Sequence, residues 1–409
     1  MNKNKLIRGV CLVAAASIFS SLQTAMAQEE EGPSWGISGW INEGVTSWDD
    51  GIGSGVAQLS ENGTTLGSRI TLAGSTNLND NGLNAGFEVI LEPQGFSNTP
   101  LIFANQDNTD SVFGHSIGVL GSSAYVGGNW GKLTVGLQSM PTDNIAVLAD
   151  PSLTLWSGIS PVFRGNGFFI RGLGAGASNT VWGSFLNCLT SNVLTGIGGI
   201  GIDCNGIYRQ GIRYDFPAFG DVSVAIGYAN DDIVDIAAKY NGKLGNLNAV
   251  LHVGYATNSD GGSVVGATGG ADNIQIQGGL MDPNTGLFGT LAIQFEEADD
   301  AIVGSGDDTD AYYLKAGIKK QWLGIGDTAL YFEYATYNDQ YGGANVDGVT
   351  GSEVEHIGLS YDQYFGSKLI LYVKYENLGL DVDGDATAQA LYGGAEDLSF
   401  LTFGLTFFF

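Results

Sequence analysis

The chain has 409 residues with 43 acidic and 16 basic side chains, and its formal net charge at pH 7 is −27. That charge excludes binding to nucleic acid through overall electrostatic attraction. An apolar fraction of 44% argues against intrinsic disorder, and 64 Gly against only 8 Pro favours many strands joined by tight turns.

The first 27 residues have the pattern of a secretory signal peptide. A basic start, an apolar stretch and small residues suited to cleavage follow one another at 3–8, 9–19 and 25–27. We therefore predict a signal peptide over 1–27 and a mature chain, 28–409, that forms a single domain outside the cytosol. No apolar run of about 18 or more residues follows, so the sequence predicts no membrane-spanning helix.

Alternation of apolar and polar residues with period two recurs along the mature chain and predicts β-strands. In residues 83–91, for example, Phe87 and Val89 share one face, whereas Glu88 lies on the other. The predicted strands are 34–48, 67–77, 82–92, 122–130, 132–140, 207–217, 221–230, 234–241, 246–256, 272–281, 287–296, 311–322, 327–337, 353–364, 368–378 and 397–409.

The connections between these strands fall into two length classes that alternate. Short clusters of Gly, Asn, Asp and Pro, such as 217–221 and 241–246, predict hairpin turns. Longer polar segments lie between them, with 230–234 as the one short member of that series. An even strand number with short and long connections in turn is typical of an outer-membrane barrel. A soluble all-β sandwich would share the alternation but would not sort its connections in this way.

Large apolar side chains alternate up to the last residue of the chain. Those predicted to face lipid are Leu401, Phe403, Leu405, Phe407 and Phe409. Their neighbours Thr402, Gly404 and Thr406 would face inward. Because every backbone polar group must be paired inside a membrane, we expect this last strand to close against the first one.

Several stretches resemble general bacterial porins of Gram-negative outer membranes. Residues 66–92 resemble the second and third strands of that family, and 124–144 resemble the fourth and fifth strands with the start of the third loop. The resemblance implies an all-β, 16-stranded antiparallel transmembrane β-barrel with an inward-folded third, constriction loop at about 141–206. It also implies a homotrimer in outer-membrane lipid and lipopolysaccharide, and a terminal Phe409 that is read by the barrel-assembly machinery.

Inward-facing basic residues are the candidate pore wall. Each lies on the strand face opposite the apolar residues, as a charge facing hydrocarbon would cost about 2–4 kcal/mol at the bilayer midplane. The predicted wall consists of Arg69, Arg209, Arg213, Lys239, Lys315 and Lys374. Opposing charges on the third loop would complete a transverse field that filters small hydrophilic solutes and ions. The candidate loop residues are Asp143, Asp150, Arg164, Arg171 and Asp203.

Cys188 and Cys204 are close in sequence and lie outside the reducing cytosol, so a disulfide is expected between them, with two free thiols as the alternative. The alternating acids of 381–386 allow a weak Ca²⁺ site among the external loops, although the rest of a calcium-binding loop is absent. The three histidines show no metal-ligand spacing, and we predict no other cofactor or metal site and no enzyme activity.

The sequence therefore favours a passive porin, and the excess of acids suggests cation preference. A substrate-selective channel with a binding track in the third loop, including Trp156 and Trp182, remains an alternative. A barrel enzyme and a non-conducting surface protein are further alternatives of another class.

Overall fold

The structure is a computed structural model that describes residues 33–58, 67–79, 81–94, 106, 116–158, 165, 167–186, 188, 202, 204, 208–230, 232–258, 270–302, 306–341 and 347–409. The predicted signal peptide, 1–27, lies outside the described residues. Among the described residues, no helix has the length and apolar character needed to cross a membrane.

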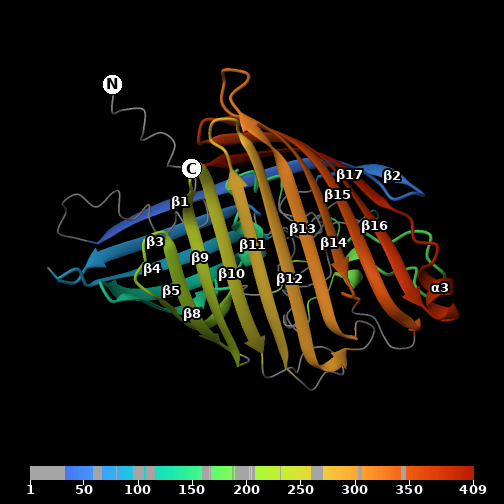
Figure 1. The fold of residues 1–409 in the computed structure, drawn as a ribbon, viewed down its shortest axis with the longest axis horizontal. Coiled ribbons are helices and arrows are strands. Elements are labelled where there is room, and N and C mark those ends of the chain that lie inside the picture. Colours follow the sequence, from blue (N-terminus) through green and yellow to red (C-terminus); the bar gives the residue numbers. More distant parts are fainter. Residues whose placement is uncertain are drawn as a thin grey trace.

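The described strands form one antiparallel sheet in which sequence neighbours are spatial neighbours (Figure 1). The strands are β1 Ser34–Asp49, β2 Ser54–Gln58, β3 Arg69–Asn77, β4 Asn84–Gln94, β5 Ser116–Gly128, β6 Gly131–Gln138, β7 Arg209–Asp215, β8 Val222–Ala229, β9 Ile233–Leu244, β10 Leu247–Asn258, β11 Ala271–Met281, β12 Leu287–Ile302, β13 Gly306–Lys320, β14 Thr328–Asn338, β15 Val349–Phe365, β16 Leu369–Gly384 and β17 Leu398–Phe408. The helices are α1 Ile145–Leu148, the 3-10 helix η4 Trp182–Phe185 and α3 Ala386–Tyr392.

The sheet closes on itself, as predicted, because β17 pairs with β1 from Trp40 opposite Phe408 to Asp49 opposite Ser399. The closure continues to the last residue, where the Gly39 and Phe409 backbones exchange two hydrogen bonds of 3.1 Å. β2 pairs with residues 45–49 of β1, and β3 pairs with residues 34–40 on the same side. β2 and β3 pair with different parts of the same strand, β1, and therefore occupy one position in the wall. The 17 strands thus fill 16 positions in the closed barrel.

Alternating side chains give the barrel an apolar outer face and a mostly polar inner face. On β17, Leu401, Phe403 and Leu405 are exposed, whereas Thr402 and Thr406 are buried on the inner face, as the sequence predicted. The tight β9–β10 turn uses Gly245, whose φ of 64° lies in the left-handed region that most side chains avoid.

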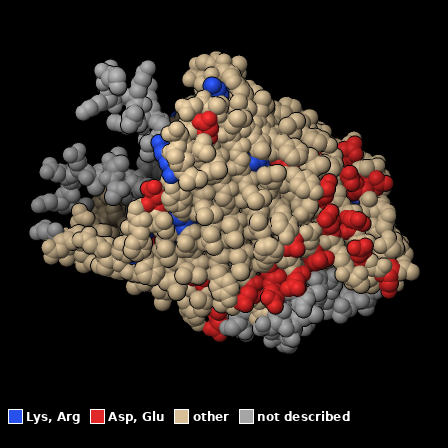
Figure 2. Space-filling view, viewed as in Figure 1, with Lys and Arg blue, Asp and Glu red and all other residues tan. Residues whose placement is uncertain are grey.

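Several strands are longer than their apolar patterns predicted. β12 reaches Ile302 and β13 starts at Gly306, so most of the predicted loop 297–310 is strand. β16 similarly continues to Gly384. Figure 2 shows acidic side chains gathered at this end of the barrel, where α3 also lies. Strands that rise beyond the hydrocarbon region no longer need an apolar outer face, so apolar alternation does not mark their ends.

The described parts of the long β6–β7 connection pack against inward-facing side chains of the wall and form an apolar core there. Phe168, Trp182 and Phe185 from this connection lie in one buried cluster with the wall alanines Ala292 and Ala311. Both alanines have no exposed surface, and they lie on the inner faces of β12 and β13. Small wall residues therefore leave room for the large side chains of the loop.

Candidate functional site

The inner face of β3 to β9 carries charged side chains that remain partly exposed. Arg69 from β3 forms an ion pair with Glu92 from β4, with Nη2 and Oε1 2.5 Å apart. The Arg69 guanidinium also lies over two aromatic rings, 5.1 Å from the centroid of Trp40 and 6.0 Å from that of Tyr208. These contacts hold a planar cation in place on the inner wall.

Arg213 from β7 connects this wall to the start of the third loop. Its Nη2 lies 2.7 Å from Asp215 Oδ1, and its Nη1 donates to the Ser139 carbonyl at 3.1 Å. Arg209 lies on the same inner face, opposite Gln138 in the β6–β7 register. Lys239 follows on the inner face of β9 and is half-buried.

Asp143 is the loop carboxylate that lies among these basic groups. It interacts electrostatically with Lys239, Arg69 and Arg213. Burial raises the pKa of Asp143 to about 6, although a hydrogen bond with Ser139 and the three basic side chains act in the opposite direction.

The adjacent loop residue, Thr142, fixes this part of the loop to the wall. Both its backbone N–H and its hydroxyl donate to Asp235 Oδ2 on β9, at 2.9 and 2.8 Å. The wall and the loop thus bring Asp143 and three of the predicted basic residues into one cluster, at the part of the lumen lined by β3 to β9.

Asp150 and Lys315 meet beneath the loop instead of in this cluster. Asp150 Oδ2 lies 2.6 Å from Lys315 Nζ, and both side chains are almost completely buried. Burial acts to raise the pKa of Asp150, but the Lys315 ammonium and the hydrogen bonds from Ser152 outweigh it, so the pKa is lowered.

Lys374 is likewise enclosed by carboxylates. Its Nζ lies 2.7 Å from Glu333 Oε2 and 2.9 Å from Glu376 Oε1, and none of these side chains is more than 1% exposed. Lys315 and Lys374 therefore have the inward orientation that the sequence predicted, but the loop and wall shield them from any open part of the lumen.

Arg171 joins the third loop to the end of β1. Its Nε donates to Asp50 Oδ2 at 2.9 Å. The Gln106 amide donates to the same carboxylate oxygen at 3.0 Å and to the Phe169 carbonyl at 2.8 Å. Partial burial acts to raise the pKa of Asp50, but these donors and the backbone N–H groups of residues 52 and 53 lower it. Two other predicted loop residues, Arg164 and Asp203, lie outside the described residues.

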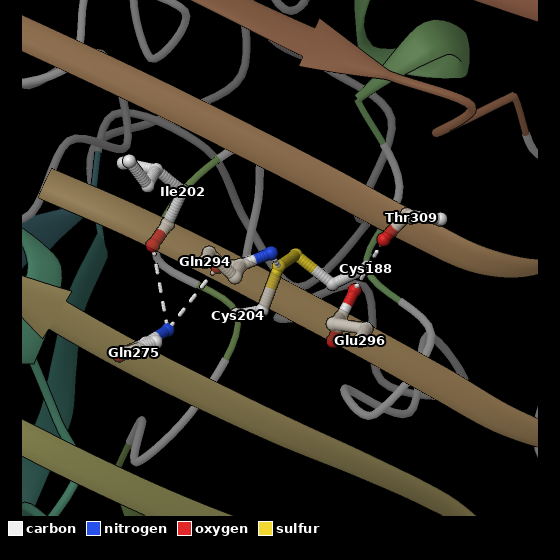
Figure 3. The surroundings of a disulfide bond; sticks show 7 residues. All are labelled: Cys188, Ile202, Cys204, Gln275, Gln294, Glu296 and Thr309. Carbon is white, nitrogen blue, oxygen red and sulfur yellow. Dashed lines mark hydrogen bonds between the residues drawn. A yellow bond between two sulfur atoms is a disulfide. The ribbon is translucent and has the colours of Figure 1, made fainter.

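The predicted disulfide is present. Cys188 and Cys204 are bonded, with Cα atoms 5.3 Å apart. Figure 3 shows the bridge against the inner wall near Gln294 and Glu296. The bridge therefore ties the last part of the third loop together where it meets β12.

Two other expectations differ from the structure. Trp156 packs edge-on against Trp40 and Phe408, with ring centroids 4.9 and 4.8 Å apart, and Trp182 has no exposed surface. Neither ring can line a binding track, because the loop uses both for packing.

The acids of 381–386 do not form a calcium-binding loop. Asp381 and Asp383 are exposed on the outer face of β16. Asp385 is the N-cap of α3 and accepts hydrogen bonds from the backbone N–H groups of Thr387 and Ala388. The alternate acids thus reflect strand alternation followed by a helix cap.

The sequence profile of Gram-negative porins matches residues 11–383. The chain belongs to the Gram-negative porin family. The closed barrel agrees with this, and the chain is therefore an outer-membrane porin. No curated protein sequence matches it.

This porin also resembles solved structures. The anion-selective porin from Comamonas acidovorans has a TM-score of 0.56 and 20% identity, covering 92% of this chain and 100% of that chain. A loop L8 deletion mutant of OmpT from Vibrio cholerae has a TM-score of 0.53 and 12% identity, covering 92% and 99%. The trimer form of that OmpT has a TM-score of 0.50 and 13% identity, covering 92% and 100%. At these identities the similarity shows a common fold.

The predicted pore wall left out the inward acids. They are Glu88, Glu92, Asp215 and Asp235. The signal was available, since each acid has the same strand parity as the basic residues. The sequence placed Glu88 on the polar face of its strand, but the predicted wall included only basic residues, so the mixed charge of this wall was not predicted.

Proposed function

We propose that this porin is a non-enzymatic, water-filled channel for passive diffusion of small hydrophilic solutes and ions across the outer membrane. The single observation that supports this is the closed 16-position barrel, whose inner face carries partly exposed charges from β3 to β9. The mature porin would be residues 28–409, after removal of the signal peptide.

The narrowest part of the channel would lie between Asp143 on the third loop and Arg69, Arg213 and Lys239 on the wall. Charges of opposite sign on two sides of a narrow passage create a transverse field that orients polar solutes. Arg209 lies on the same inner face and would extend the basic side. Lys315 and Lys374 would stabilise the loop instead of contacting solute, since both are enclosed.

The ion preference of the wild-type porin would arise at the outer mouth, because the charges of opposite sign at this passage balance one another, and removing one of them would shift the preference. Around the passage, the inward acids and the inward basic residues are equal in number. The acids are Glu88, Glu92, Asp143, Asp215 and Asp235, and the basic residues are Arg69, Lys132, Arg209, Arg213 and Lys239. The outer end of the barrel carries acids on several strands, among them Glu297, Asp308 and Asp381. These would raise the local concentration of cations within a Debye length of about 8 Å and give a cation preference that weakens with salt.

The porin would assemble as a homotrimer in outer-membrane lipid and lipopolysaccharide. The trimer form among the similar structures supports this oligomeric state. Phe409, which is 43% exposed beside the β1–β17 seam, would be the residue that the barrel-assembly machinery reads.

Planar-bilayer recording of the purified porin tests the proposal. We expect stepwise conductance that rises linearly with salt concentration, and cation selectivity that is larger in dilute salt. Saturating conductance would favour the alternative of a substrate-selective channel with a binding site. A porin that inserts without conducting would overturn the channel function.

A triple variant tests the basic wall separately. Replacing Arg69, Arg209 and Arg213 by Ser should raise the permeability of cations relative to anions. An unchanged reversal potential in a salt gradient would exclude these three residues as a selectivity wall. Lys374→Met is the control, because it removes a basic residue that is enclosed and does not face the passage. Any change in ion permeability in that variant would reflect altered folding.

A further inference from the structure

Three side chains with metal-binding atoms meet where the third loop contacts β12. The two sulfur atoms of the Cys188–Cys204 bridge and a carboxylate oxygen of Glu296 all lie within 4.8 Å of one another. Cys188 and Cys204 are each 1% exposed, and Glu296 is 2% exposed. In Figure 3, Glu296 lies on the strand next to the bridge.

Polar neighbours orient this group. Gln294, two residues before Glu296 on the inner face of β12, places Nε2 2.9 Å from Cys204 Sγ. Thr309 from β13 donates its hydroxyl hydrogen to Glu296 Oε2 at 3.2 Å. Donors of this kind around a sulfur and a carboxylate are the groups that orient ligands in metal sites.

We propose that reduction of the Cys188–Cys204 bridge converts this place into a site for a thiophilic divalent cation such as Zn²⁺. The ligands are the two thiolates and the Glu296 carboxylate. Ligand atoms on one tetrahedral zinc lie roughly 3.5 Å apart, given bonds of about 2.0–2.3 Å. The three donors are already close enough to meet that spacing after small side-chain movements.

The chemistry proceeds in two balanced steps. A small dithiol reductant transfers two electrons to the bridge, the S–S bond breaks, both sulfurs become thiols, and the dithiol becomes a cyclic disulfide. When the cation binds, each thiol releases one proton to water and leaves a thiolate. Three negative ligands on a cation of charge +2 then leave one coordination position for water.

The choice of cation follows from the donors. Two thiolates select soft or borderline cations such as Zn²⁺ and Cd²⁺ over Mg²⁺ and Ca²⁺, which prefer oxygen ligands. The bound cation would join the same two loop positions that the disulfide joins. The cation would therefore hold this part of the loop against β12 in the reduced porin. This inference does not depend on which solutes or ions cross the channel.

Cadmium titration of the purified full-length porin in detergent tests the site. The protein is reduced with dithiothreitol, the reductant is removed without air, and mass spectrometry verifies two free thiols per chain. We expect the ultraviolet absorption of cadmium–thiolate bonds to saturate at one Cd²⁺ per chain, and Zn²⁺ to displace it. The oxidised porin should give no such absorption.

Two matched variants separate the site from the cysteines alone. Glu296→Gln should weaken Cd²⁺ binding to the reduced porin by at least about tenfold. Glu297→Gln should not, because Glu297 is exposed on the outer face of the same strand. Cys188→Ser should reduce the absorption to at most that of a single cadmium–thiolate bond.

Three results would overturn the proposal. One is a reduced porin with two thiols that shows no cadmium–thiolate absorption. Another is equal Cd²⁺ affinity in Glu296→Gln and Glu297→Gln. The third is a reduced porin that loses the electrophoretic mobility of the folded barrel, because the site requires the folded wall.

Discussion

The two sides of the barrel interior treat inward charges in opposite ways. On β3 to β7, the side chains of Arg69 and Arg213 are 14% and 22% exposed, and their acid partners are similarly open. On β13 and β16, Lys315 and Lys374 are at most 1% exposed. All four basic residues have the same strand parity. Parity therefore reveals which face of the wall a residue occupies, but not whether water reaches it.

The third loop creates this difference. It covers β12 to β17 with an apolar core and contributes Asp150 and the Gly158 carbonyl, which lies 2.7 Å from Lys315 Nζ. A charge removed from water needs a partner and further hydrogen bonds. The loop is thus chemically matched to the charges that it covers, whereas Arg69 and Arg213 can rely partly on water.

The largest expected effect comes from breaking the covered ion pair. Lys315→Met leaves the buried Asp150 carboxylate without its cation, and we expect the free energy of unfolding to fall by about 3–5 kcal/mol. Urea unfolding of the porin in lipid vesicles, followed by the mobility of the folded barrel on gels, measures this change.

The double variant Lys315→Met with Asp150→Leu provides the control. Removing both charges should recover most of the lost stability, because no buried charge remains alone. If the double variant is as unstable as the single one, the loss comes from packing around Lys315 and not from an isolated carboxylate.

A smaller effect is expected at an open ion pair. Arg213→Gln removes a partner of Asp215, but that carboxylate remains partly exposed and lies 3.6 Å from Lys132 Nζ. We expect the free energy of unfolding to change by about 1 kcal/mol or less in the same urea experiment. A loss as large as that of Lys315→Met would mean that exposure does not distinguish the two sides of the lumen.

The sequence was sufficient to predict the barrel, because lipid imposes an alternation of apolar and polar side chains on every spanning strand. It predicted that the last strand closes against the first and that Cys188 joins Cys204, and both hold in the structure. It did not predict which inward charges would be covered. Asp150 and Lys315 are 165 positions apart, and no periodic pattern connects a loop residue to the strand on which it will pack.

The next expected effect concerns ion permeability. Asp143→Asn removes a negative charge from the cluster of Arg69, Arg213 and Lys239. A unit charge acting through water over about 8 Å changes the energies of a cation and an anion by roughly 0.5 kcal/mol each, in opposite directions. Screening over a Debye length of about 8 Å reduces each change to roughly 0.2 kcal/mol, so the ratio of cation to anion permeability should fall by about twofold. Reversal potentials in a salt gradient measure this ratio. Asp383→Asn, which removes only one of several acids at the outer end of the barrel, is the matched control and should change the ratio less.

The smallest effect is the pH dependence of the same ratio. Because the pKa of Asp143 is raised to about 6, its carboxylate is charged above that pH and neutral below it. The cation preference of the wild-type porin should therefore fall as the pH is lowered through about 6. Other groups titrate over the same pH range. The informative quantity is therefore the difference in the ratio of cation to anion permeability between wild type and Asp143→Asn at each pH. That difference should be full at about pH 8 and vanish near pH 4.5, two conditions on either side of the raised pKa. A difference that stays constant over this range would show that Asp143 keeps its charge, and that water reaches Asp143 as it reaches Arg69 and Arg213.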